Sequence, residues 1–264
     1  MKISLIIPVY KNITFLDMII ESLKIQSYKN FELIVTEDAE NIEMKEFILL
    51  KKKEVDFSII HVFQEDIGFR KNKALNNAVK VAKGDLLIFV DGDCILHNKF
   101  IEEYKKAYEE GECFIGRRQE LGPNFTKKII GLKKVKLKMM EIIFSDSNRK
   151  EFKEAFYFGG MKRKSRALSL LGSNYAVKKE TLLKINGFDE DYTGYGWEDC
   201  DLEWRLRKTG AKFVSMKGRA IQYHMWHPEN LNEEMEWKKN KDLFDRKQKL
   251  DNHKCKNGLE KLED

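Results

Sequence analysis

The sequence of 264 residues lacks the features that define secreted, disulfide-bonded and membrane-spanning proteins. No apolar run approaches the ~18 residues of a membrane span. The opening MKISLIIPVYKN is too short an apolar run for a signal peptide and is interpreted as a strand. Four widely spaced cysteines without a Cys-x-x-Cys pair predict free thiols in a reducing compartment: Cys94, Cys113, Cys200 and Cys255. Together, these absences predict a cytoplasmic protein.

Glycine is missing from the turn after the first predicted strand, Ile3 to Pro8. A dinucleotide-binding enzyme needs G-x-G-x-x-G there, and Val9 to Asn12 contain no glycine, which excludes a dehydrogenase. A sugar-1-phosphate nucleotidyltransferase would need a glycine-rich, basic loop at the same place to hold a triphosphate. No such loop follows Asn12, so a nucleotidyltransferase is the weaker alternative.

Two carboxylates follow the most apolar stretch of the chain. Leu86 to Val90 is typical of a strand buried on both faces, and Asp91-Gly92-Asp93 comes directly after it. Parallel α/β sheets bind ligands at the carboxyl ends of their strands, where hard oxygen donors suit Mg²⁺ or Mn²⁺ beside a substrate's phosphates. The competing interpretation is an ordinary Asp-Gly-Asp turn.

Apolar strands alternate with helical patterns through the first half of the chain. Strands are expected at Ile3 to Pro8, Phe31 to Thr36 and Phe57 to Val62, before the strand at Leu86. Asn12 is a suitable N-cap for the first helix. This alternation predicts an α/β protein with a mostly parallel sheet.

A second acid-rich stretch, Gly194 to Asp201, precedes a predicted helix at Leu202 to Lys208. Acids at a helix N-terminus complement its dipole, and Asp201 can pair with Arg205 at i,i+4. Three acids beside an aromatic and two glycines exceed what capping requires. A carboxylate next to an aromatic platform can also deprotonate a sugar hydroxyl.

Two of the 5 histidines, His224 and His227, lie three residues apart after a predicted strand at Ala220 to Tyr223. An isolated histidine is usually a structural hydrogen-bonding group. A pair at a strand end makes a metal or phosphate role reasonable.

The positive charge of the chain is concentrated in residues 125–168, with thirteen Lys/Arg against four Asp/Glu. Thr126 to Phe144 is predicted to form one basic amphipathic helix, and Gly159 to Leu168 a mobile basic loop. Contact with an anionic lipid or a phosphorylated acceptor is one interpretation, and a solvated lysine face over an ordinary core stripe is the other. Beyond Leu231 we expect a peripheral helix with a frayed end.

These motifs, taken in order, resemble bacterial family-2 glycosyltransferases of GT-A fold with a galactosyltransferase-like C-terminal half. The resemblance covers Lys2 to Pro228 and rests on IIPVYKN, DIGFR, IFVDGDC, GSNYAV, INGFDEDYTGYGWEDCDLEWRL and YHMWHP. It implies a Rossmann-like sheet flanked by helices, divided into a nucleotide-sugar-binding half (1–116), a basic helical insertion (117–170), an acceptor and catalytic half (171–230) and a charged helical tail (231–264).

The resemblance also implies roles for individual residues. Mn²⁺ or Mg²⁺ would be held by Asp91, Asp93 and His224. The donor nucleotide would be bound by Pro8, Tyr10, Glu37, Asp38, Asp66, Arg70, Asp91 and Asp93. Asp199 matches the catalytic base, while the acceptor would contact Asn174, Trp197 and Glu198.

One position departs from the family. Members often have Arg-Asn in the helix before the Asp-x-Asp strand, and this chain has Leu75-Asn76. Phosphate contacts made by that arginine would have to come from Arg70, Lys71 or Lys73.

The predicted function is therefore metal-dependent, inverting transfer of a sugar from a UDP-sugar to a hydroxyl of a cell-surface glycan or lipid-linked glycan. The protein would be cytoplasmic, with peripheral contact at an anionic inner membrane face. A non-catalytic glycan-binding or membrane-recruited partner is an alternative from another class. Nucleic-acid binding is not expected, because no motif accompanies the local basicity.

Overall fold

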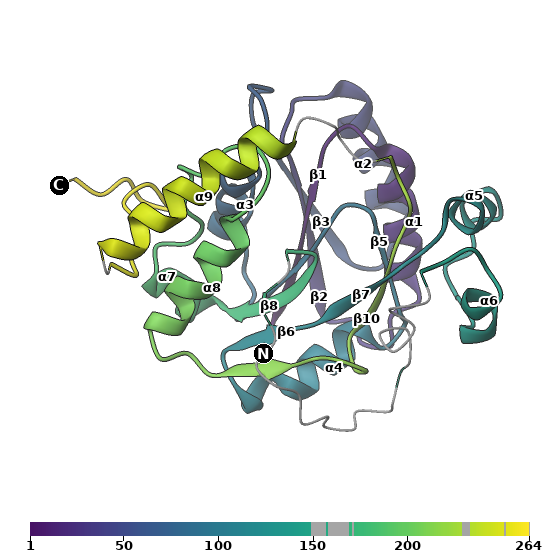
Figure 1. The fold of residues 1–264 in the computed structure, drawn as a ribbon. Coiled ribbons are helices and arrows are strands. Elements are labelled where there is room, and N and C mark those ends of the chain that lie inside the picture. The colour runs from purple at the N-terminus through teal and green to yellow at the C-terminus, as the bar shows by residue number, and fades with distance from the viewer. Residues whose placement is uncertain (149–156, 158–168, 171, 229–232, 251, 264) are drawn as a thin grey trace.

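The computed structural model describes the chain except for residues 149–156, 158–168, 171, 229–232, 251 and 264 (Figure 1). The basic loop predicted at Gly159 to Leu168 lies outside the described residues. In the rest of the chain, no helix is both long and apolar enough to cross a membrane.

The centre of the fold is a seven-stranded sheet with the order β3-β2-β1-β4-β8-β6-β9. Only β8 runs antiparallel to its neighbours, so the predicted mostly parallel α/β sheet is confirmed. Its strands are β1 (Ile3–Val9), β2 (Phe31–Glu37), β3 (Ser58–Phe63), β4 (Leu86–Val90), β6 (Cys113–Ile115), β8 (Asn174–Lys178) and β9 (Phe213–Ser215).

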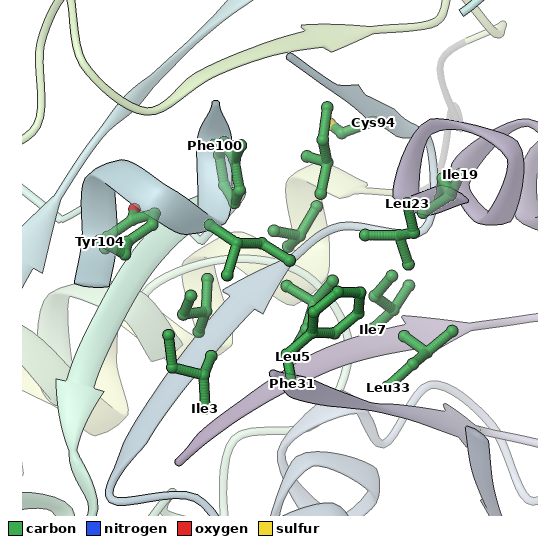
Figure 2. Close-up of a cluster of buried hydrophobic side chains, with 14 of the residues drawn as sticks. Ile3, Leu5, Ile7, Ile19, Leu23, Phe31, Leu33, Cys94, Phe100 and Tyr104 are labelled. Atoms are coloured by element: carbon green, nitrogen blue, oxygen red, sulfur yellow. The ribbon is translucent and has the colours of Figure 1, made fainter. Parts of the chain in front are cut away.

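Helices cover both faces of this sheet, which explains why β4 is apolar throughout and β1 is apolar except for Ser4. On one face, Ile3, Leu5 and Ile7 of β1 pack against α1, α2 and α4 (Figure 2). On the other face, Ile6 and Phe89 pack against α3, α7 and α8. The bounds are α1 (Ile13–Lys24), α2 (Ile42–Glu54), α3 (Lys71–Val81), α4 (Phe100–Ala107), the 3₁₀ turn η1 (Tyr108–Glu110), α7 (Lys179–Lys184) and α8 (Glu198–Lys208).

A second sheet of three strands has the order β5-β10-β7 and was not predicted as a sheet. Its members are β5 (Cys94–Leu96), β7 (Arg117–Glu120) and β10 (Ile221–His224). Strand β5 has only three residues and β7 reads Arg-Arg-Gln-Glu, so neither has an apolar pattern long enough to identify. The antiparallel β5–β10 register places Cys94 opposite His224.

The single helix predicted at Thr126 to Phe144 is wrong. The structure has two helices, α5 (Pro123–Gly131) and α6 (Met139–Ile143). Helix α5 ends with Lys134 N donating to Ile129 O at 2.8 Å, and Lys133 has a left-handed φ of 47°. In the intervening residues 134–138, lysines alternate with Val135 and Leu137, a period of two that fits extended chain better than helix.

The helix predicted after Leu231 is present, but the chain that follows it is held in place rather than frayed. Helix α9 (Glu233–Lys249) packs on the loop before α8, beside α3 and α8 in Figure 1. The residues after α9 are held by Asn186, whose Nδ2 donates to Cys255 O at 2.8 Å and to Glu260 O at 2.9 Å. The sequence of α9 and of the residues after it is too polar to predict that they pack on the rest of the chain, because hydrogen bonds make many of these contacts.

Candidate active site

The Asp-Gly-Asp turn lies at the carboxyl end of β4, at the centre of the large sheet. A Cβ at Gly92 would lie 2.5 Å from Pro8 O, so the close approach of β1 requires glycine there. Asp91 Oδ1 accepts a hydrogen bond from Lys71 Nζ at 3.0 Å, and Arg118 Nη1 lies 3.8 Å from Asp91 Oδ2. Asp91 therefore faces two cations.

Asp93 points instead toward two histidines. His224 Nε2 and His227 Nε2 each lie 3.3 Å from Asp93 Oδ2, and the candidate ligand atoms of these three residues lie within 4.8 Å of one another. Burial opposes ionisation of Asp93, but the hydrogen bonds from the two histidines hold its pKa well below the usual range. The bond to Asp93 raises the pKa of His227 to about 9.

This trio fits a divalent cation. One carboxylate and two imidazoles suit Mn²⁺ better than Mg²⁺, which prefers oxygen ligands. The ladder between β5 and β10 sets the arrangement, because β5 begins directly after Asp93 and pairs with the strand that ends at His224. Met225 N also donates to Asp93 O at 2.8 Å.

Asp199 lies in the first turn of α8, within electrostatic reach of both Lys71 and Asp91. Its Oδ2 accepts a hydrogen bond from Gly172 N at 2.7 Å. Burial and the negative charge of Glu198 raise the pKa of Asp199 to about 7, while Lys71 opposes the rise. A carboxylate of this pKa is poised to accept a proton near neutral pH.

Lys71 connects the two acidic centres. Burial disfavours its charge, but Asp91, Asp199 and Glu198 together outweigh that effect and raise its pKa. A persistent cation therefore lies between the end of β4 and the start of α8.

The third acid of the α8 turn has a structural role. Asp201 is buried and its Oδ2 accepts from Arg205 Nε at 2.7 Å, which confirms the predicted i,i+4 pair. Arg205 Nη1 also donates to Ile185 O at 3.0 Å and Gly187 O at 2.8 Å. This ion pair anchors α8 to the turn after α7.

Trp197 precedes α8 in a left-handed conformation, with φ of 68°. Its ring lies 5.3 Å from that of Trp237 and 5.2 Å from that of Phe244, both on α9. Asn240, fully buried on α9, donates to Thr193 O and Tyr195 O, each at 3.2 Å. Helix α9 thus fixes the loop that leads into the acid cluster.

The residues predicted to bind the nucleotide gather at the carboxyl ends of β1 and β2 and in the loop after β3. Tyr10 is exposed, and its hydroxyl lies 3.4 Å from Asp66 Oδ2. Asp38 accepts from Gln64 Nε2 at 2.6 Å and from Arg70 N at 2.5 Å, so it also shapes that loop. Glu37 is fully buried against His61, at 3.1 Å.

Asn174, predicted to contact the acceptor, is placed differently. Its side chain is fully buried and accepts from Tyr104 Oη at 2.6 Å while donating to Arg117 O and Ala220 O. This amide joins the two sheets and has no surface for a sugar, so we leave it out of the acceptor site. Asn76, which follows Leu75 at the departure from the family pattern, similarly donates to Phe188 O at 2.8 Å.

Sequence reasoning missed Arg118 and gave Lys71 only as one of three substitutes for the missing arginine. The signal for Lys71 was its place at the start of the helix before the Asp-x-Asp strand. Arg118 had no signal, because the strand that positions it was not predicted.

Two family models match this chain. The model for glycosyl transferase family 2 matches residues 4–167, and the model described as the N-terminal domain of galactosyltransferase matches residues 155–228. The chain belongs to glycosyl transferase family 2, with the GT-A fold.

Relatives at 25% identity include validoxylamine A glucosyltransferase of Streptomyces hygroscopicus subsp. jinggangensis and chondroitin synthase of Escherichia coli. The matches cover 83% of this chain and 55% of the first relative, and 88% of this chain and 36% of the second. The chain thus spans about half or less of these relatives.

Solved structures share the fold at low identity. Staphylococcus aureus TarS has a TM-score of 0.62 at 16% identity, covering 92% of this chain and 39% of that one. GalNAc-T7, solved with UDP, GalNAc and Mn²⁺, has a TM-score of 0.65 at 13% identity, covering 93% and 47%.

Proposed function

We propose that this chain is a metal-dependent, inverting glycosyltransferase that moves a sugar from a UDP-sugar to a hydroxyl of a cell-surface or lipid-linked glycan. The observation that carries the proposal is the pairing of two acidic centres across Lys71. One, at the end of β4, has beside it three side chains that could hold a cation, and the other has a carboxylate whose pKa is raised to about 7.

The donor would lie across the carboxyl ends of β1, β2 and β4. Tyr10 and Asp66 would contact the base, and Asp38 would hold the loop that carries Arg70. Lys71 and Arg118 already face Asp91 and are the cations nearest the place of the diphosphate. TarS has been solved with UDP-GlcNAc, which supports a UDP-sugar, whereas a Pyrobaculum calidifontis mannosyltransferase was solved with GDP-Man and Mn²⁺.

Asp93, His224 and His227 would hold the cation, with Asp91 beside them. When bound, the cation supplies Lewis-acid assistance to the departing diphosphate. Asp199 would act as the general base. It would remove the proton of the acceptor hydroxyl as that oxygen bonds to the anomeric carbon of the donor sugar and the bond from this carbon to UDP breaks. Glu198 and Trp197 would orient the acceptor sugar.

The test is a panel of nucleotide sugars, with released nucleoside diphosphate measured in Mn²⁺, in Mg²⁺ and in chelator. We expect UDP release from one UDP-sugar, dependent on a divalent cation and stimulated by acceptor. Absence of release from every donor, with normal UDP binding, would favour the non-catalytic alternative. Pyrophosphate released from UTP and a sugar-1-phosphate would favour the nucleotidyltransferase.

A further inference from the structure

We propose that the segment Leu121 to Asn148, here named the α5–α6 surface, docks on an anionic lipid bilayer. This inference rests on the proposed function in one respect, since it would bring the active site to a membrane-held acceptor. Docking itself can be measured without donor or acceptor.

The α5–α6 surface exposes large apolar side chains. Phe144 is 80% exposed, Leu132 64% and Met140 53%. Phe144 N donates to Met140 O at 3.1 Å, so the two side chains project from the same side of α6. Exposed apolar clusters of this kind mark interaction sites, and such side chains insert at the boundary of headgroups and acyl chains.

Lysines flank these apolar residues in the sequence. The segment has two acids and six lysines, of which Lys127, Lys128, Lys136 and Lys138 are exposed, while Lys133, also exposed, pairs with Asp17 of α1 at 3.1 Å. Both acids are engaged within the segment: Glu141 pairs with Lys134, and Asp146 accepts from Asn124 N at 2.8 Å and Phe125 N at 3.0 Å. The outward charge is therefore positive, which complements anionic headgroups and opposes the pairing of two copies through this face.

The α5–α6 surface is firmly attached beside the cation site. Phe125, Ile129 and Ile142 are buried in a cluster with Tyr223 and Met225 of the β10 region. Thr126 Oγ1 accepts from Trp226 N at 2.9 Å, and Trp226, between the two histidines in sequence, is itself exposed. Docking would therefore hold the His224 edge of the active site close to the headgroups.

The experiment is vesicle co-sedimentation of the full chain, without donor, on phosphatidylcholine alone and on phosphatidylcholine mixed with phosphatidylglycerol. We compare wild type with Phe144→Ser and with Lys136→Glu/Lys138→Glu. The matched control is Lys52→Glu/Lys53→Glu, the same charge change at exposed positions of α2. A cooperative thermal melt verifies that each variant is folded.

We expect wild type to bind the mixed vesicles, and to bind them less as salt rises. Phe144→Ser should weaken vesicle binding roughly tenfold, since the variant has no phenyl ring to bury in the bilayer. Each lysine near the headgroups contributes roughly fivefold to vesicle affinity. Lys136→Glu/Lys138→Glu should therefore weaken binding more than Phe144→Ser does, while Lys52→Glu/Lys53→Glu in α2 should leave it unchanged. Equal binding to both vesicle types, equal loss in the control, or a dimer dissociated by Phe144→Ser would overturn the proposal. If the wild-type chain binds anionic vesicles but turns over no nucleotide sugar, only the proposed function is refuted.

Discussion

Lys71 Nζ lies 3.0 Å from Asp91 Oδ1 and within electrostatic reach of Asp199, so one partly buried ammonium group couples the two acidic centres of the site. Its charge holds the pKa of Asp199 lower than burial and Glu198 alone would set it. The protonation of the proposed base therefore depends on a residue from the donor side.

Lys71→Met should move the acidic limb of the kcat/KM profile to higher pH. The sign follows from the charge: removing a cation makes ionisation of Asp199 harder, so its pKa rises further above about 7. Lys80→Met, which removes an exposed charge from the same helix, is the control. An unmoved limb in Lys71→Met would show that this coupling does not act on the base.

Asp199→Asn should lower kcat by about 10²–10⁴, the usual loss for a general base, and leave UDP and Mn²⁺ affinity unchanged. The amide can still accept from Gly172 N, so the fold is retained. Steady-state kinetics and calorimetry on one preparation make the comparison. Near-normal turnover would transfer the role to Glu198, because Asp201 is committed to Arg205.

The same variant should be more heat-stable than wild type at neutral pH. Folding raises the pKa of Asp199 from 3.8 to about 7, so its ionisation costs stability as pH rises through that window. Asparagine never ionises and avoids this cost. Thermal melts should show a Tm advantage for Asp199→Asn above pH 7 that shrinks toward pH 4; a pH-independent difference contradicts the shift.

His227→Ala should weaken Mn²⁺-dependent UDP binding about as much as His224→Ala does, since both imidazoles face Asp93 at 3.3 Å. Asp93→Ala should abolish it, because few ligands remain to compensate the diphosphate charge. His253→Ala, at an exposed position, is the matched control. Normal Mn²⁺ titration in His227→Ala would favour the ligand set predicted from the sequence, with Asp91 in its place.

Asn240→Ala should lower acceptor turnover while sparing donor binding. Its amide holds two carbonyls of the loop that leads to Trp197, and a lost buried hydrogen bond costs about 1–3 kcal/mol. Acceptor KM should rise and kcat fall, with UDP affinity unchanged. Lys238→Ala, at an exposed position of the same helix, should leave acceptor KM, kcat and UDP affinity unchanged. A fall in UDP affinity would mean that α9 supports the whole fold.

The sequence predicted the large sheet well, because a strand buried on both faces is apolar at every position. Asp91 and Asp93 could be proposed because they directly follow such a strand, whereas Asp199 was chosen among three neighbouring acids by the family resemblance. The second sheet could not be predicted, since β7 consists of charged and polar residues and is stabilised by its neighbour β10. The roles of Asn174 and α9 depend on hydrogen bonds to distant backbone, which no local pattern encodes.

The β5–β10 ladder has a consequence for engineering. The register of β5 and β10 places Asp93 beside His224 in the proposed cation site, whereas Tyr10, Asp66 and Arg70 lie on connecting loops. The two parts of the site are therefore separable modules. Loops from relatives with other donor preferences could be exchanged at residues 64–70 while the cation site keeps its shape. A one-residue insertion in β5, by contrast, would turn every side chain of that strand to the opposite face.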